Sequence, residues 1–450
     1  MNPLLLITCV ALATLQVALP RCWAFLPLLV AACHTPYTPF LGGLTVARVV
    51  IMIGLVRAGT AGWLSWSPRN RLDLLVGVFA VFVLLSTVGH NWSPNNPLNA
   101  RLRLVLDVMG TYLYMRAYLA NERSLEFFSR GLAMILVPFA LFLLAEAKTG
   151  LNPYRVVGVQ VIYSQVRDGK IRASGPFGTP ILAGTVGAIS IPLLMPIWKT
   201  RRREAIAGLG ASLAIVYSSA SSGPIATAAI GLVATAFWRW RQYLKPALVG
   251  TCMLLLVLNF IKNRPIWYLM ALMDFVGGST GWHRAVLMDM AARHFGEWWL
   301  FGSDYTRHWM PYGLAEVPEH CDLTNYYIHL GVTGGLGVVI SLLAIQLISF
   351  SVLGRKISEL RQAGNPNEFA FWCLGSALFA HAVTFLSISY FDQIYVFFWG
   401  LIGGLTGFVA RDLTNETPSL GEESGEDSPT DAVAGNSLIW GRGEARRNLD

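Results

Sequence analysis

The stretch "YYIHLGVTGGLGVVISLLAIQLISFSV", residues 326–352, decides the fold class of this chain. It contains no Asp, Glu, Lys or Arg, and most of its side chains are apolar. A bilayer core about 30 Å thick is crossed by roughly 20 such residues in a helix, and about 17 to 25 are tolerated. The stretch therefore predicts a transmembrane helix, with the ionisable His329 about one turn into it.

Eleven other stretches have the same apolar character. They are residues 3–19, 43–57, 73–90, 103–121, 126–147, 179–198, 205–220, 223–239, 246–262, 369–390 and 393–410. Of the 450 residues, 54% are hydrophobic and only 13% charged, which is more apolar surface than a soluble core needs. We therefore predict an all-α polytopic membrane protein of about 12 transmembrane helices. The shorter apolar stretch 23–33 is either a re-entrant segment or a further span.

Basic residues between the apolar stretches predict the orientation of the chain. Clusters at 199–203, 239–245 and 354–361 are expected on the cytoplasmic side, so the formal charge of +8 reflects topology and we expect no nucleic-acid partner. The first stretch has no preceding Lys or Arg and no clear cleavage site, which indicates an uncleaved anchor. The predicted division is 1–262 for the first spans with an outer loop at 148–178, 263–325 for a large periplasmic loop, 326–410 for the last spans, and 411–450 for a disordered cytoplasmic tail.

Motifs for nucleotide, metal or hydrolase chemistry are absent from the sequence. It has no Walker A, GxGxxG, HExxH or GxSxG pattern. Its six cysteines follow no metal-ligand or disulfide spacing, and most lie inside apolar stretches. We therefore expect no cofactor and no metal ion in the reaction.

Charged groups gather instead in the two predicted outer loops. In the first loop, the Asp-Gly dipeptide at 168–169 predicts a hairpin turn. In the second, residues 281–295 have helical spacing that places Asp289 and Arg293 to pair, four residues apart. Arg284 has no acid at the corresponding position. It is therefore free to hold a ligand, unless it only extends toward lipid headgroups.

Two interpretations fit His320 and Asp322, just before the stretch quoted above. Asp322 suits the N-cap of the following helix, which would give the segment a structural role. Alternatively, His320 faces an active site. His329 is a further candidate, because an ionisable group at membrane depth is costly unless it is paired or faces a wet cavity.

Four short motifs occur in order along the chain. Residues 171–194 contain an Arg, a small residue, Phe and Pro before an apolar stretch; residues 217–232 open with Ser and Gly; residues 281–302 hold an Arg in a helical pattern. The fourth is His320-Cys321, followed by nine residues and Gly-Val-Thr-Gly at 331–334. Together, over about residues 150–345, they resemble the motifs of the O-antigen ligase and Wzy-type polysaccharide polymerase superfamily.

Some positions depart from the motifs of that superfamily. Cys321 stands where it has Asn, Ser or Gln, and Ser222 stands where ligases often have Arg. Gly-Leu at 335–336 replaces a Thr-Pro of many ligases, and Trp299 and Asp304 replace the Pro and last Gly of the third motif's ending. The sequence thus leaves open whether the chain resembles a ligase or a polymerase more closely.

The resemblance implies a GT-C-like membrane glycosyltransferase acting at the outer face of the bacterial inner membrane. Its donor would be a polyprenyl-diphosphate-linked glycan, and its acceptor a hydroxyl of a glycan or of a lipid-A-core-type molecule. A leaving diphosphate requires fixed positive charge, for which Arg172 and Arg284 are the candidates, and His320 would act as general base. The further substrate-binding candidates are Asp322, Arg293, Arg307, Trp298, Trp299 and Trp309.

Alternatives remain for these residues and for the whole chain. Each tryptophan also suits anchoring at the membrane interface, where lipids would be its partners. A lipid-linked sugar flippase or another transporter would have a similar number of spans, although short outer loops are more typical of such proteins. A non-catalytic assembly partner of a secretion or envelope complex would not need arginines and a histidine together in one long loop. Other polysaccharide-assembly membrane proteins are possible partners of a transferase.

Overall fold

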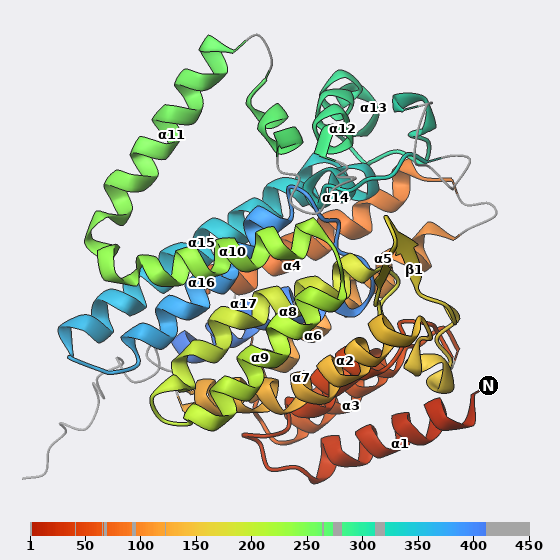
Figure 1. The fold of residues 1–450 in the computed structure, drawn as a ribbon, viewed down its shortest axis with the longest axis vertical. Helices are drawn as coiled ribbons and strands as arrows, with labels where there is room; N and C mark the ends of the chain where they lie inside the picture. Colours follow the sequence, from red (N-terminus) through yellow and green to blue (C-terminus); the bar gives the residue numbers. More distant parts are fainter. Residues whose placement is uncertain are drawn as a thin grey trace, which may run out of the picture. The chain divides into compact units, whose positions relative to one another are not determined.

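The structure is a computed structural model that describes residues 2–40, 42–64, 66, 70–91, 96–121, 123–262, 265–272, 281–310 and 320–410. In these ranges the chain is almost entirely helical (Figure 1), which confirms the all-α prediction in its coarse form. The predicted tail at 411–450 lies outside the described residues.

The helices of the first half are α1 (Pro3–Ala18), α2 (Leu26–His34), α3 (Val46–Thr60), α4 (Arg71–Leu85), η1 (Ser86–Gly89), α5 (Pro97–Val105), η2 (Leu106–Gly110), α6 (Thr111–Tyr118), α7 (Arg123–Thr149), η3 (Pro153–Val157), α8 (Pro180–Leu194), η4 (Met195–Trp198) and α9 (Arg202–Ser218). Those of the second half are α10 (Ser222–Ala236), η5 (Phe237–Tyr243), α11 (Leu244–Ile261), η6 (Ile266–Leu272), α12 (Gly281–Arg293), α13 (Phe295–Trp298), η7 (Arg307–Trp309), α14 (Tyr326–Gly334), α15 (Leu336–Gln362), α16 (Glu368–Thr384), η8 (Asp392–Ile394) and α17 (Tyr395–Ala410). Every apolar stretch of the sequence overlaps one or more of these helices.

Six helical segments of the described chain are long and apolar enough to cross a membrane. They are Arg71–Gly89, Ser124–Thr149, Pro180–Trp198, Ser222–Ile261, Leu336–Gln362 and Asp392–Val409. Two shorter apolar helices are Pro3–Ala18 and Glu368–Thr384. The structure thus supports several membrane-spanning helices, whereas the predicted number of 12 stays a prediction.

The stretch 326–352 is not one helix, and the prediction of a single span there is wrong. The backbone breaks between α14 and α15 at Gly335, whose φ is +82°. A Cβ atom at this position would collide with the carbonyl oxygen of Leu300. Leu336 donates its backbone N–H to the carbonyl of Trp299 at 2.7 Å. Residues 299–306, named the outer segment because they belong to the predicted outer loop, are thereby hydrogen-bonded to the break. Glycine is required here because the close approach and the positive φ both exclude a side chain.

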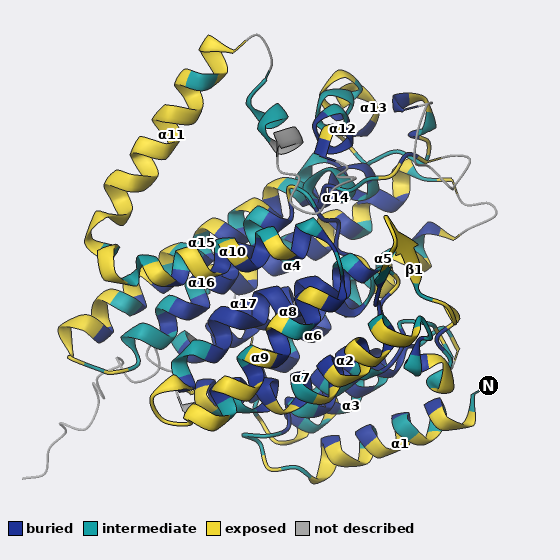
Figure 2. Cartoon of the chain, viewed as in Figure 1, coloured by how far each residue is buried: buried dark blue, intermediate teal, exposed yellow. Residues whose placement is uncertain are grey.

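Burial divides the helices into an inner and an outer set (Figure 2). Helices such as α6, α8 and α17 are mostly buried, whereas α11 has no buried residue. Apolar side chains cover α11, among them Leu254, Val257 and Phe260, each more than half exposed. An exposed apolar surface of this extent is typical of a helix that lipid or another protein covers.

Candidate functional site

Arg172 ends a short hairpin that the sequence predicts correctly. Strands β1 (Gln165–Arg167) and β2 (Lys170–Arg172) pair antiparallel, and Gln165 lies opposite Arg172. Asp168 and Gly169 have φ values of 52° and 73°, which is the left-handed conformation that a two-residue turn of this kind needs. The turn reverses the chain direction, and the Arg172 side chain at the end of β2 is buried.

The Arg172 side chain lies among residues of another sequence motif. It is only 8% exposed, and its Nη2 donates to Ser221 Oγ at 2.6 Å. The next residue, Ala173, donates its backbone N–H to the carbonyl of Ser218 at 2.9 Å. The first two motifs, residues 171–194 and 217–232, therefore meet at this arginine.

The backbone that follows Arg172 is held by two carboxylates that sequence reasoning missed, the buried Glu146 and the partly buried Asp392. Glu146, near the end of α7, accepts hydrogen bonds from the backbone N–H groups of Ser174 and Gly175 at 3.0 and 2.8 Å. Asp392 accepts from the N–H of Gly178 at 2.6 Å. Both acids lie far from Arg172 along the chain, and no local motif marks them. They fix the loop from which Arg172 projects.

Arg284 lies on α12 and is buried to the same degree, at 8% exposed. Burial lowers the pKa of its guanidinium, the charge of Asp322 opposes that shift, and the charge of Arg167 adds to it. Burial also lowers the pKa of Arg172, and again Arg167 adds to the shift. Arg172 and Arg284, more than a hundred residues apart, therefore lie in the electrostatic range of the same third arginine.

The two buried arginines have donors without partners. The Nε atoms of Arg172 and Arg284 make no hydrogen bond with any described residue. No carboxylate of the described chain forms an ion pair with either side chain. A buried guanidinium donor without an acceptor costs free energy, so an anion that accepts from either Nε atom would lower that cost.

His320 is exposed and lies just before α14, within electrostatic range of His329. Asp322 is exposed too, and its backbone carbonyl lies 3.0 Å from Nε2 of His283 on α12. The interpretation of Asp322 as the cap of the next helix is wrong, because the N-cap is Asn325, whose side chain accepts from Ile328 N at 3.1 Å. Asn325 suits this position equally well chemically and is three residues nearer the helix.

The remaining predicted substrate-binding residues lie around α12, α13 and η7. Trp298 is buried against Gly331 and donates its indole N–H to the carbonyl of Ala291 at 2.9 Å. Trp309 is also buried, whereas Trp299 is 46% exposed. Trp299 is therefore the tryptophan of the three that is best placed to meet a sugar ring.

Two arginines complete the predicted set, and one expected ion pair is not formed. Arg307 begins η7 and is partly buried, and Arg293 is exposed at the end of α12. The predicted pair of Arg293 with Asp289 is wrong, because Asp289 accepts instead from Trp267 Nε1 and Tyr268 OH at 2.9 and 2.7 Å. Neutral donors on η6 thus replace the expected cation.

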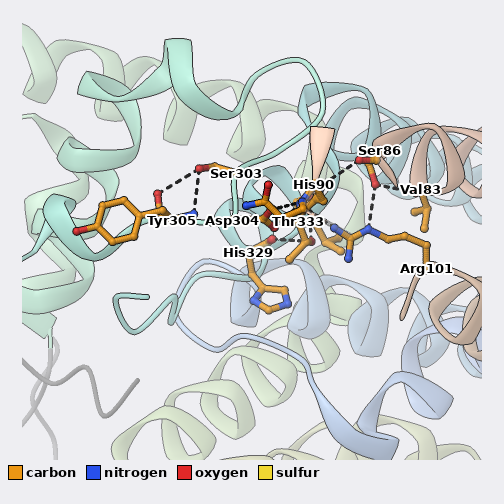
Figure 3. Close-up of polar contacts among 11 residues, drawn as sticks. Val83, Ser86, His90, Arg101, Ser303, Asp304, Tyr305, His329 and Thr333 are labelled. Carbon is orange, nitrogen blue, oxygen red and sulfur yellow. Dashed lines mark hydrogen bonds and ion pairs between the residues drawn. The ribbon is translucent and has the colours of Figure 1, made fainter. Parts of the chain in front are cut away.

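A second polar cluster, also missed by sequence reasoning, joins the outer segment to η1 and α5 (Figure 3). Arg101 donates to Ser86 Oγ at 3.0 Å and approaches His90 Nε2 at 2.8 Å. Because arginine only donates, Nε2 of His90 accepts, and its Nδ1 donates to the carbonyl of Ser86 at 2.8 Å. Asp304 accepts from Asn91 N at 2.6 Å. The cluster anchors the segment that enters the α14–α15 break.

Comparisons with known proteins add no relative. No family model matches this chain, and no curated protein matches its sequence. The function that the four motifs imply is therefore a proposal.

Proposed function

We propose that this chain is a membrane glycosyltransferase of the ligase or polymerase type. It would transfer a glycan from a polyprenyl diphosphate to an acceptor hydroxyl at the outer face of the bacterial inner membrane. The observation that carries the proposal is the pair of buried arginines, Arg172 and Arg284, whose Nε donors have no partner among the described residues. Both lie within electrostatic range of Arg167.

Burial separates this proposal from the interpretation that these arginines only reach toward lipid headgroups. A side chain that extends to the membrane surface keeps its charged end in water. Arg172 and Arg284 are each 8% exposed, so their guanidinium groups are largely withdrawn from solvent. The charge of Arg167 adds to the electrostatic cost of burying each guanidinium group, and a bound anion would lower that cost. A diphosphate matches both the charge and the fork of donors that guanidinium presents.

The proposed reaction uses the arginines for the leaving group and His320 for the acceptor. The acceptor hydroxyl loses its proton to His320 and its oxygen bonds to the anomeric carbon. The bond from that carbon to the diphosphate oxygen breaks, and the oxygen keeps the electron pair. Fixed positive charge stabilises the transition state because negative charge grows on the diphosphate as the bond breaks. A general base near the hydroxyl contributes typically a factor of about 10² to 10⁴.

The setting of the site supports a lipid-linked donor. Several helices are long and apolar enough to cross a membrane, and α11 exposes apolar side chains along its length. The polyprenyl chain of the donor would lie in the same bilayer. The acceptor, a glycan or a lipid-A-core-type molecule, and other polysaccharide-assembly membrane proteins are the further partners that the proposal implies.

Ion pairs inside the helix bundle favour a second candidate, a flippase or other transporter, because charged groups at membrane depth often mark transport pathways. Arg48 and Asp107 form such a pair at 2.8 Å. Their hydrogen bonds satisfy one another, however, and Tyr37 completes the group with bonds of 2.6 Å to both. A closed group of this kind fits a structural role better than an ion path.

The proposal is tested with purified protein and a lipid-linked glycan donor. Release of polyprenyl diphosphate together with a new glycosidic bond supports it, and absence of both with an active donor preparation contradicts it. Gel analysis of surface polysaccharide in a deletion strain then separates the two reaction types. Loss of all lipid-attached polymer indicates a ligase, and single repeat units in place of long chains indicate a polymerase.

A further inference from the structure

Three potential metal ligands converge between α13 and η7. They are Nδ1 of His294, Nε2 of His308 and a carboxylate oxygen of Glu297, and all lie within 4.8 Å of one another. Glu297 Oε1 lies 2.7 Å from His294 Nδ1 and 3.0 Å from His308 Nε2. No pattern in the sequence indicates this group, because His308 follows Glu297 at a spacing that matches no metal motif.

Neighbouring side chains hold the three ligands in place. Trp309 donates its indole N–H to Glu297 Oε2 at 3.0 Å. The ring of His294 stacks on Trp309, with centroids 5.6 Å apart and an angle of 11°, and the ring of His308 stacks on Tyr305 at 5.1 Å and 13°. Second partners that orient a carboxylate and fix imidazole rings are typical of metal sites.

The spacing of the ligands suits a small tetrahedral cation. With zinc–ligand bonds of about 2.0–2.1 Å, neighbouring ligand atoms of a tetrahedron lie about 3.3–3.4 Å apart. Two of the distances in the cluster fall slightly short of this value, and the group spans at most 4.8 Å. The three side chains are between about a quarter and two fifths exposed, so they have room to adjust.

We propose that His294, Glu297 and His308 bind one Zn²⁺ ion, with a water molecule at the fourth position. Two imidazoles and one carboxylate are a ligand set that zinc uses.

Zinc at this place would tie α13 to η7 and close the segment 299–306 between them. That segment carries Asp304, which accepts a hydrogen bond from Asn91, and Ser303, which donates to the carbonyl of Val332 at 2.7 Å. The ion would therefore fix the outer segment where it enters the α14–α15 break. This role does not depend on the proposed transferase activity.

The test uses the full-length chain in detergent, without a histidine tag and stripped of metal by a chelator. Zn²⁺ titration by calorimetry is expected to give one site per chain, and Co²⁺ in its place is expected to give the visible absorption of a tetrahedral complex. The variants His294→Ala, Glu297→Gln and His308→Ala should each weaken Zn²⁺ binding on the order of a hundredfold, more than loss of an outer partner does. Zn²⁺ should also raise the melting temperature of the wild-type chain but not that of His308→Ala.

The control is His283→Gln, a histidine of α12 outside the cluster, and it should bind Zn²⁺ like the wild-type chain. Glu297→Gln keeps an oxygen that accepts the bond from Trp309, so this variant distinguishes lost coordination from lost folding. Absence of stoichiometric binding in the wild-type chain overturns the proposal. So does an unchanged affinity in Glu297→Gln and His308→Ala when both run as folded protein on size exclusion.

Discussion

Arginine is buried in two regions of this protein, and its surroundings differ between them. In the helix bundle, Arg48 forms two parallel hydrogen bonds of 2.8 Å with the Asp107 carboxylate. In the outer region, Arg172 reaches one hydroxyl, Ser221 Oγ, and its Nε has no partner among the described residues. Arg284 likewise forms no ion pair with a described carboxylate. Burial is similar, but of these three arginines only Arg48 forms a hydrogen-bonded ion pair with a described carboxylate.

The difference teaches how to separate structural from functional charge. In a buried ion pair, the two side chains satisfy each other's charge and hydrogen bonds, so no further molecule is needed. Removing one of them leaves an uncompensated buried ion that destabilises the fold. A buried cation with an open donor is incomplete until an anion arrives. Asp107 of this pair lies on η2, where the helix opens into a π turn at Leu106–Gly110.

Breaking the inner pair should have the largest effect on the folded protein. Asp107→Leu leaves Arg48 buried without its carboxylate, which costs about 3–5 kcal/mol. We expect poor accumulation in the membrane and a marked drop in melting temperature after detergent extraction. The double variant Arg48→Met with Asp107→Leu should recover most of the loss, because an apolar pair of similar volume replaces a buried ion pair at little cost.

The matched control removes an outer arginine instead. Arg172→Met should change the melting temperature little, since no carboxylate is left unpaired when this side chain is lost. The comparison between the two regions fails if Arg172→Met destabilises the protein as much as Asp107→Leu does. It also fails if Asp107→Leu melts like the wild-type chain.

The second prediction concerns chemistry in the outer region. His320→Ala should insert and accumulate normally, because the side chain is exposed and the cap of α14 is Asn325. Glycan transfer should fall by roughly 10²- to 10⁴-fold, the usual contribution of a general base. Transfer is measured with purified protein and lipid-linked donor at matched protein levels. Near-normal transfer would remove His320 from the reaction.

Local sequence sufficed for the parts of this fold that depend on neighbours in the chain. The Asp-Gly dipeptide at 168–169 predicted the hairpin turn, and apolar stretches predicted the helices, because both patterns are set within a few residues. The break at Gly335 was not predictable, since its cause is the carbonyl of Leu300 packed against it. No pattern within residues 326–352 reports that tertiary contact.

For the candidate site, the sequence likewise indicated some residues but not their tertiary contacts. Arg172 and Arg284 were found by chemistry and motif, but their burial and their shared proximity to Arg167 required the structure. Glu146 was missed, and Asp304 was noted without its hydrogen-bond partner, because the groups that they bind lie 28 and more than 200 residues away in the sequence. The roles of these carboxylates depend on tertiary contacts, and no local sequence pattern distinguishes them from other acidic residues.

A smaller effect is expected when the charge of an outer arginine is kept and its shape is changed. Arg284→Lys retains a cation but loses the planar fork that can hold two phosphate oxygens. Charge-assisted hydrogen bonds contribute roughly 1.5–3 kcal/mol each, so transfer should slow about ten- to a hundredfold. Arg355→Lys, on α15 in a segment predicted to be cytoplasmic, is the control and should leave the transfer rate unchanged. Equal rates for wild type and Arg284→Lys would mean that Arg284 supplies only a point charge.

The smallest effect is expected for Asp322→Asn. The direction of the change in KM for the lipid-linked donor tests whether the outer arginines bind an anionic substrate. Asp322 is exposed and its charge opposes the loss of positive charge on Arg284. Neutralising it keeps the side-chain volume and leaves the Asn325 cap in place, so stability should not change.

With that carboxylate gone, the diphosphate is no longer repelled by a negative charge near Arg284. Exposed charge pairs contribute about 0.2–1 kcal/mol, so KM for the lipid-linked donor should fall, by up to about fivefold, while kcat stays within about twofold. Added salt should reduce the difference between Asp322→Asn and wild type, because screening weakens interactions between exposed charges. A rise in KM would instead show that the charge of Asp322 contacts the substrate directly. Asp322 would then be a residue that binds the acceptor, rather than one that modulates the electrostatics of Arg284.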